Sequence, residues 1–126
     1  MNPDKIFGLF NEETNQDKEL ENFKESNYFK LSMFLKVLKN KDNINNLLSN
    51  LTNEDLGNVG EHITFYRAYY WFEQIDIESI CKSDIILLDF TNIEFAIDYT
   101  IKFYESLEEY EKCAELKKFK DTILSL

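Results

Sequence analysis

The chain has very few residues of the kind that tight turns require, with three glycines and one proline in 126 residues. This scarcity argues against a hairpin-rich β-sandwich or barrel and favours long helices. Hydrophobic residues nevertheless make up 44% of the chain and aromatic residues 15%, which is too apolar a composition for a disordered chain. We therefore expect one helical domain over residues 1–126, with residues 1–16 as a loosely attached N-terminal segment.

Long apolar runs and paired cysteines are also lacking. No run of about 18 apolar residues occurs, so no transmembrane helix is predicted, and the N-terminus lacks the pattern of a signal peptide. Cys81 and Cys113 are expected to be free thiols in a reducing compartment, with a disulfide between them as the alternative. Arg67 is the only arginine among 14 basic residues. This preference for lysine, with frequent asparagine, is typical of AT-rich coding sequence and indicates a cytoplasmic protein of bacterial or phage origin.

The sequence motifs of common enzyme and metal sites are absent. His62 is the only histidine, and a metal site normally needs further His or Cys ligands or a dense carboxylate cage. There is no glycine-rich phosphate loop and no nucleophile-elbow serine. Helix capping and solvation account for Asp84, Asp89, Glu94 and Asp98. We therefore expect no catalytic residue, no metal and no cofactor, and we expect His62 at a helix surface or cap.

Apolar residues recur every three or four positions, which predicts helices, and polar capping residues mark where they begin. The expected helices cover residues 4–10, 17–39, 43–51, 53–74, 77–82, 93–107 and 109–124. Thr52 and Asp55 form a capping-box-like start, Asp76 is a further expected cap, and Thr91-Asn92 is expected to cap the helix from residue 93. Residues 84–90 could form a short strand in isolation, but without a second strand we interpret them as a buried turn or loose helical segment.

These helices predict an all-α fold, a compact bundle of five to seven helices with a C-terminal αα-hairpin. In the last helix the inward residues are expected to be Tyr110, Cys113, Ala114, Leu116, Phe119 and Ile123. Residues 107–119, LEEYEKCAELKKF, resemble the UVR-type helical hairpin of excision-repair and protease-adaptor proteins. The positions that carry this resemblance are Tyr110, Glu111, Lys112, Ala114, Glu115 and Leu116. This resemblance implies protein–protein contact. The same stretch is similar to the turn between the helices of a tetratricopeptide unit, which implies an aromatic residue packed at the turn and a small residue that lets the two helices approach.

Negative charge is concentrated in the middle of the chain. The net charge is −10 overall, and residues 54–111 hold fourteen acidic and three basic residues, a net charge of −11. Such a field repels nucleic-acid phosphates and attracts basic partners. Residues 28–53 carry a net charge of +3, which is interpreted as a solvated helix face. We therefore expect neither nucleic-acid binding nor membrane binding.

The most informative stretch is residues 63–72, ITFYRAYYWF. On a helix, Phe65, Tyr69 and Phe72 share one face, and further aromatic residues lie around the other faces. Core packing is the first interpretation of such a helix. The second is a protein-binding hot spot, for which Tyr, Trp and Arg are the enriched residue types. The predicted partner-binding residues are Tyr66, Arg67, Tyr70, Trp71 and Glu73.

These observations favour a non-enzymatic interaction protein, a small acidic helical adaptor, inhibitor or accessory factor whose partner is a protein with a basic surface. Self-association is compatible with the same surface. One alternative is an acidic mimic of nucleic acid that blocks a DNA- or RNA-binding enzyme. A second is a small-ligand binder or enzyme with a site inside the bundle, which would need a ligand-sized cavity with convergent polar groups.

Overall fold

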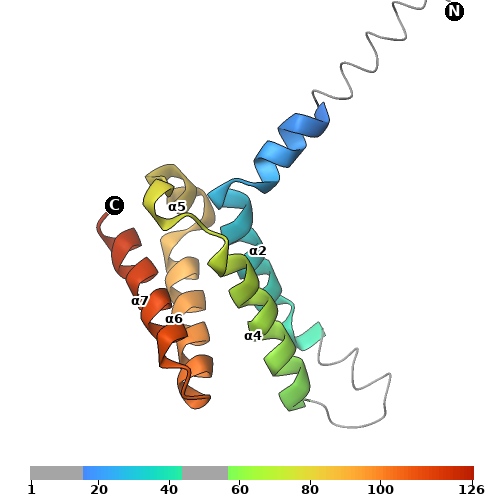
Figure 1. Ribbon diagram of the computed structural model, residues 1–126, viewed down its shortest axis with the longest axis vertical. Coiled ribbons are helices and arrows are strands. Elements are labelled where there is room, and N and C mark those ends of the chain that lie inside the picture. Colours follow the sequence, from blue (N-terminus) through green and yellow to red (C-terminus); the bar gives the residue numbers. More distant parts are fainter. Residues whose placement is uncertain (1–15, 44–56) are drawn as a thin grey trace, which may run out of the picture.

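The structure, a computed structural model, describes residues 16–43 and 57–126 (Figure 1). Every regular element in these residues is helical, which confirms the all-α prediction. A helix over residues 16–24 is followed by α2 (Asn27–Lys39), α4 (Gly57–Glu73), the short 3-10 helix η1 (Ile77–Ser79), α5 (Lys82–Leu88), α6 (Phe90–Ser106) and α7 (Tyr110–Leu124). The helices expected over residues 4–10 and 43–51, and the predicted cap at Thr52 and Asp55, lie outside the described residues.

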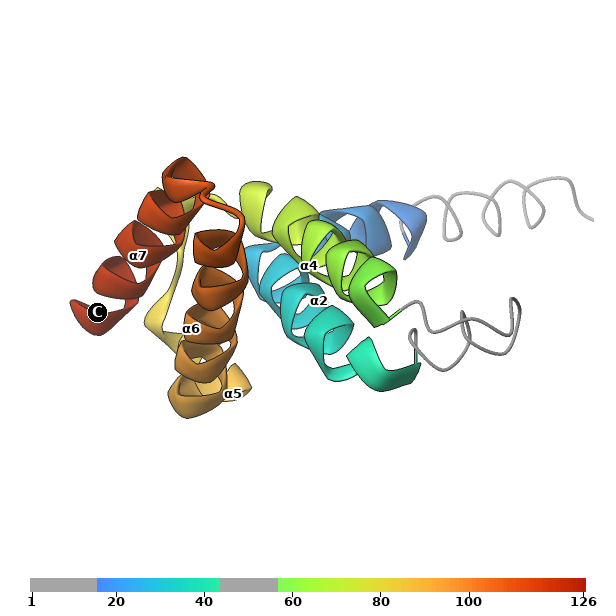
Figure 2. The same ribbon diagram turned by 90° about the horizontal axis from the view of Figure 1, so that it is seen from below.

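The helices form a bundle of two antiparallel pairs. Figures 1 and 2 show α2 beside α4 and α6 beside α7, with α5 at the end of the bundle where α2 begins. The pair α6–α7 is the predicted C-terminal αα-hairpin. The helix over residues 16–24 extends from the start of α2, away from the rest of the bundle.

Aromatic and aliphatic side chains from four helices form the core. Phe34 of α2 lies 6.1 Å from Phe72 of α4, and Phe72 lies 5.3 Å from Phe119 of α7, measured between ring centroids. Tyr104 of α6 is completely buried, and its hydroxyl donates a 3.1 Å hydrogen bond to the backbone oxygen of Phe65. These contacts join both helix pairs. The remaining fully buried apolar side chains are Leu31, Phe65, Ala68, Ile93, Ile97 and Leu116.

The helix expected over residues 17–39 is interrupted at Ser26. The Ser26 hydroxyl accepts a 3.2 Å hydrogen bond from the Phe29 amide and donates to the Phe23 carbonyl, so it caps α2. The next residue, Asn27, accepts a bond from the Asp76 amide and donates to the Asp76 carbonyl, at 2.9 and 3.0 Å. The chain therefore turns at Ser26 because a local cap and a distant loop both stabilise the break.

The segment between α4 and α6 is helical but more exposed than expected. Asp76 accepts a 3.3 Å hydrogen bond from Glu78, which confirms the predicted cap, although the helix that follows is a 3-10 turn ending at Ser79. Residues 82–88 form α5, so of the two interpretations of residues 84–90, a buried turn or a loose helical segment, the helical one holds for residues 84–88. The prediction that this segment is buried was wrong for Ile86 and Leu87, whose side chains are exposed.

The predicted cap of α6 was also wrong. Asp89, rather than Thr91-Asn92, precedes the helix, and its carboxylate accepts a 3.1 Å hydrogen bond from the Thr91 amide. Asp89 has φ of 68°, a conformation that Asp tolerates better than most residues. Since α5 ends at Leu88, only a residue that both turns the chain and caps the next helix fits at this position.

In α7 the inward face is narrower than expected. Leu116, Phe119 and Ile123 are buried as predicted, but Tyr110 is 64% exposed and Ala114 is also exposed. Tyr110 lies six residues before Leu116, which places it about 120° away around the helix. The prediction that Tyr110 and Ala114 point inward was therefore wrong, and Cys113 is half-buried.

In the turn between α6 and α7, the backbone of Glu108 adopts a strained conformation, and this strain can be tested. Glu109 donates a 3.0 Å hydrogen bond to the Tyr104 carbonyl and Glu108 donates to the Glu105 carbonyl, the pattern of a Schellman motif in which glycine is preferred. Glu108 has φ of 59°. We expect Glu108→Gly to raise the free energy of unfolding by about 0.5–1 kcal/mol, because glycine adopts this conformation without a Cβ clash. Urea denaturation measures this change.

The matched control for this prediction is Glu105→Gly, in the last turn of α6. Glycine at a helical position destabilises by about 0.5–1 kcal/mol, so this variant should unfold at lower urea concentration than the unmodified protein. Destabilisation by both substitutions would contradict the strained turn.

Candidate partner-binding surface

Helix α4 has one buried face and one exposed face. Phe65, Ala68, Tyr69 and Phe72 are buried against the other helices, so the face that Phe65, Tyr69 and Phe72 were predicted to share is part of the core. Phe65 stacks on Phe103 of α6 with ring centroids 4.2 Å apart, and Tyr69 lies 5.3 Å from the Tyr104 ring. The inner face therefore fixes which side of α4 is turned outward.

Four apolar side chains occupy the outward side of α4. Val59, Ile63, Tyr66 and Tyr70 are 47%, 37%, 50% and 59% exposed. Their spacings of four, three and four residues place them in one row, which we call the α4 row. The row spans twelve residues, or about 16 Å along the helix. Large apolar side chains exposed singly are ordinary, whereas a continuous row of them is typical of a contact surface.

The structure separates the five predicted partner-binding residues into two groups. Tyr66, Arg67, Tyr70 and Glu73 are exposed on α4. Trp71 is partly buried and packs edge-on against Phe29 of α2, with ring centroids 5.7 Å apart, while its other neighbour is Tyr70 at 5.5 Å. Trp71 therefore lies at the boundary between core and surface.

Val59 and Ile63 were not among the predicted residues. The prediction contained only aromatic and charged residues, although the three- and four-residue spacing back from Tyr66 includes both aliphatic residues. The exposed apolar surface also extends beyond α4. Phe29 contacts Phe23 with ring centroids 5.5 Å apart, and Phe23 and Leu20, in the helix over residues 16–24, are both about half exposed.

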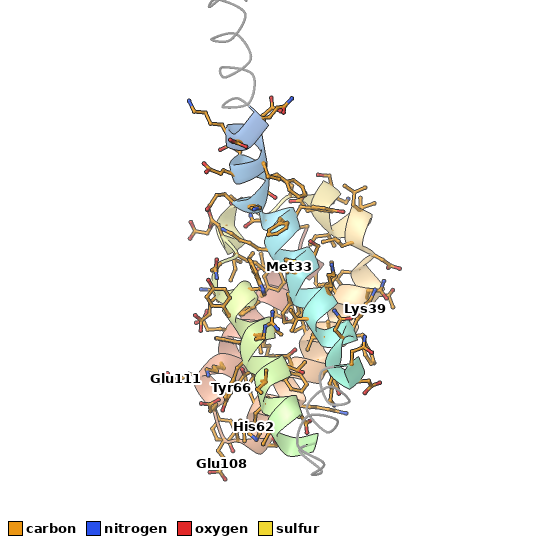
Figure 3. All side chains as sticks on the ribbon, turned by 90° about the vertical axis from the view of Figure 1, so that its right-hand side faces the viewer. Met33, Lys39, His62, Tyr66, Glu108 and Glu111 are labelled. Atoms are coloured by element: carbon orange, nitrogen blue, oxygen red, sulfur yellow. The ribbon has the colours of Figure 1, made fainter. Side chains whose placement is uncertain are left out.

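Carboxylates border the α4 row on the side of α7. An open groove of about 450 Å³ is lined there by Tyr69, Glu73, Glu111, Lys112, Ala114 and Glu115. Figure 3 shows the α2–α4 side of the molecule. Tyr66 of α4 and Glu111 of α7 are both labelled toward the left of this view. The surface therefore combines an apolar row with a groove that carries three carboxylates.

Tyr69 forms part of this groove, and its pKa responds to burial and to the carboxylates nearby. Burial, followed by the nearby carboxylates Glu73 and Glu115, raises the pKa of Tyr69 from 10.0 to about 12. The unfolded chain releases this phenolic proton near pH 10 and the folded chain near pH 12, so the folded state binds more protons between these values. The stability that depends on neutral Tyr69 is complete below pH 10 and is lost as the pH rises through about 12.

We therefore expect the free energy of unfolding to fall between pH 10 and pH 12, and this fall to be smaller in Tyr69→Phe. Denaturation at a series of pH values measures the fall, and ultraviolet absorbance of the phenolate measures the titration directly. An identical pH dependence in both proteins would contradict this assignment.

The groups considered for catalysis or metal binding are dispersed. His62 is half-buried on α4 and packs edge-on against the rings of Tyr66 and Phe103, with centroids 5.8 and 5.2 Å away. Cys81 and Cys113 are both free, and the Cys113 thiol contacts the Ile101 carbonyl at 3.5 Å. Within residues 16–43 and 57–126 there is no group of three or more His, Cys, Asp or Glu side chains placed to hold a metal ion.

A second hollow lies on the other side of the bundle, between α2 and α6. It has a volume of about 310 Å³ and a mainly apolar lining of Leu35, Leu38, Lys39, Asn92, Phe95, Ala96 and Tyr99. Its polar groups come from Lys39, Asn92 and Tyr99. It contains no carboxylate, histidine or cysteine, so the convergent polar groups required by the ligand-binding alternative are few.

None of the helices in the described part of the chain is long and apolar enough to cross a membrane. Comparison with protein-family models, with curated proteins and with solved structures found no significant match. The resemblance of residues 107–119 to a UVR-type or tetratricopeptide-like hairpin therefore depends on those residues alone.

Proposed function

We propose that this protein is a non-enzymatic interaction protein, a small acidic adaptor, inhibitor or accessory factor of a bacterial or phage-infected cell. It binds another protein through the outer face of α4. The partner presents apolar side chains to the α4 row and basic side chains to the neighbouring carboxylates. The observation that carries this proposal is the continuous exposed row of Val59, Ile63, Tyr66 and Tyr70.

The composition of this face supports a protein partner. Tyrosine and arginine are enriched among residues that dominate binding energy, and Tyr66, Arg67 and Tyr70 lie together on the exposed side of α4. Tyr66 also contacts the buried Tyr104 ring at 6.4 Å. An anchor that is already held by its neighbours loses less conformational entropy when it binds.

The charge distribution supports a basic partner. Glu73, Glu111 and Glu115 line the groove beside the α4 row, and residues 54–111 as a whole carry a net charge of −11. Complementary charge accelerates association and is screened by salt. Complex formation should therefore slow as the salt concentration rises.

A nucleic-acid mimic is the less favoured alternative. Such a mimic needs a continuous line of free carboxylates, but Lys120 lies 2.9 Å from Asp98 and 3.6 Å from Glu94, which neutralises part of the acidic surface of α6. If the mimic interpretation is right, the protein should compete with DNA for its partner.

The test is affinity purification from the source organism with three versions of the chain as bait: the unmodified protein, Tyr66→Ala/Tyr70→Ala, and Phe95→Ala. Phe95 is 72% exposed on α6 and serves as an aromatic control away from the α4 row. We expect one partner to be retained by the unmodified bait and by Phe95→Ala, to be released by high salt, and to be lost with the double variant. Equal retention by all three baits would contradict the proposal.

A further inference from the structure

One lysine near the α4 row occupies an unusual environment. The Lys112 ammonium of α7 lies 4.8 Å from the ring centroid of Tyr104, 5.2 Å from that of Tyr69 and 5.6 Å from that of Tyr66. Its Nζ donates a 3.4 Å hydrogen bond to Glu109 Oε2. We call these three tyrosines the tyrosine cage. Two of them come from α4 and one from α6, and the cation they surround comes from α7.

The cage has the chemistry of a site for an organic cation. A cation within about 6 Å of the face of an aromatic ring is attracted by the ring quadrupole, and clusters of such rings recognise ammonium groups. Tyr104 is completely buried and Tyr69 nearly so, so these two rings form a fixed floor. Tyr66 is half exposed and belongs to the α4 row. The cage therefore opens onto the surface at which we propose that the partner binds.

The cage is accessible from the acidic groove. Glu73, Glu111 and Glu115 line the groove, as do Tyr69 of the cage and Lys112, the cation inside it. The Lys112 side chain is itself 32% exposed. Because the groove is open and its carboxylates attract cations, an incoming basic side chain would meet the carboxylates first and the tyrosine rings next.

We infer that the tyrosine cage is a binding site for a lysine or arginine side chain of the partner, and that Lys112 fills it in the free protein. This inference rests on the proposed function. A lysine of the same chain is present at a high effective concentration, so it excludes free cations from the cage. A partner docked along the α4 row holds its own cation beside the cage and replaces Lys112, whose ammonium then moves into solvent.

Removal of Lys112 tests the cage without any partner. We expect tetramethylammonium chloride to shift the ring resonances of Tyr66, Tyr69 and Tyr104 in the NMR spectrum of Lys112→Ala, and these shifts to saturate. In the unmodified protein the same shifts should require a concentration of tetramethylammonium at least about tenfold higher, because the tethered Lys112 competes for the cage. Lys117→Ala, which removes an exposed lysine from the same helix, should behave as the unmodified protein. Sodium chloride at equal ionic strength controls for screening.

The inference is overturned if Lys112→Ala responds to tetramethylammonium no more than Lys117→Ala does. If Lys112→Ala does not fold, the NMR spectrum of the unmodified protein is the test. The Hε protons of Lys112 should then lie upfield of those of the other lysines because of ring currents, and a normal shift would overturn the inference.

A third measurement separates this inference from the proposed function. On binding of the co-purified partner, the Hε resonance of Lys112 should move to the position of a solvated lysine. If the partner binds along the α4 row while this resonance stays unchanged, the partner does not replace Lys112 in the cage. The inference is then wrong, and the proposed function stands.

Discussion

Replacement of Phe119 by alanine should lower the free energy of unfolding by about 3–5 kcal/mol, the usual cost of removing a fully buried phenylalanine. Phe119 is 0% exposed, and its ring lies edge-on to Phe72 with centroids 5.3 Å apart. This contact joins α7 to α4. Since a domain of this size is stabilised by only about 5–15 kcal/mol, the variant should be partly or wholly unfolded in urea concentrations that leave the unmodified protein folded.

The matched control is Phe95→Ala, the same substitution on an exposed residue. Phe95 is 72% exposed and stacks on Tyr99, with ring centroids 6.1 Å apart. Its replacement should change the free energy of unfolding by no more than about 0.5 kcal/mol. Equilibrium urea denaturation of both variants gives the comparison. Equal destabilisation by the two substitutions would mean that α7 is not attached to the bundle through Phe119.

Replacement of Tyr70 by alanine should weaken binding of the partner by about thirtyfold or more, since a central aromatic anchor contributes about 2 kcal/mol or more to an interface. Tyr70 is the most exposed member of the α4 row, so its loss should leave the fold unchanged. Titration calorimetry with the purified partner measures the affinity, and circular dichroism checks the fold.

Phe95→Ala is again the control, because it removes an exposed aromatic ring from another helix. Its affinity should equal that of the unmodified protein. Trp71→Ala is a poorer test, because Trp71 packs against Phe29 and its replacement would disturb both the fold and the surface. Unchanged affinity in Tyr70→Ala would remove the α4 row from the interface.

Periodic apolar patterns predicted most of the helices. The spacing of Phe65, Tyr69 and Phe72 placed them on one face of α4, and the spacing of Leu116, Phe119 and Ile123 identified the inner face of α7. These patterns succeed because a helix that packs on one side must repeat its apolar residues every three or four positions.

Distant contacts account for what the patterns could not predict. The break at Ser26 depends partly on Asn27 reaching the backbone of Asp76, 49 residues away in sequence. The two residues with positive φ, Asp89 and Glu108, occupy turns where sequence signals favour glycine or asparagine. Local propensity therefore gave the wrong start for α6.

The candidate surface was only partly predictable, because it too depends on contacts between residues that are distant in sequence. The aromatic stretch is evident from the sequence, but a helical wheel does not say which side of α4 packs against the rest of the bundle. Packing of Trp71 on Phe29 places it partly inside, whereas Tyr66 and Tyr70 remain exposed beside Val59 and Ile63. The tyrosine cage was not predicted, because its rings come from α4 and α6 and the lysine that fills it comes from α7.

The central claim is that the outer face of α4 binds the partner. NMR cross-saturation from an unlabelled, co-purified partner to the labelled protein tests it most directly, because saturation passes only to side chains in contact. We predict the strongest saturation at the methyl groups of Val59 and Ile63 and at the rings of Tyr66 and Tyr70. Saturation confined to other exposed apolar residues, such as Ile86 and Leu87 of α5 or Phe95 of α6, would contradict the claim.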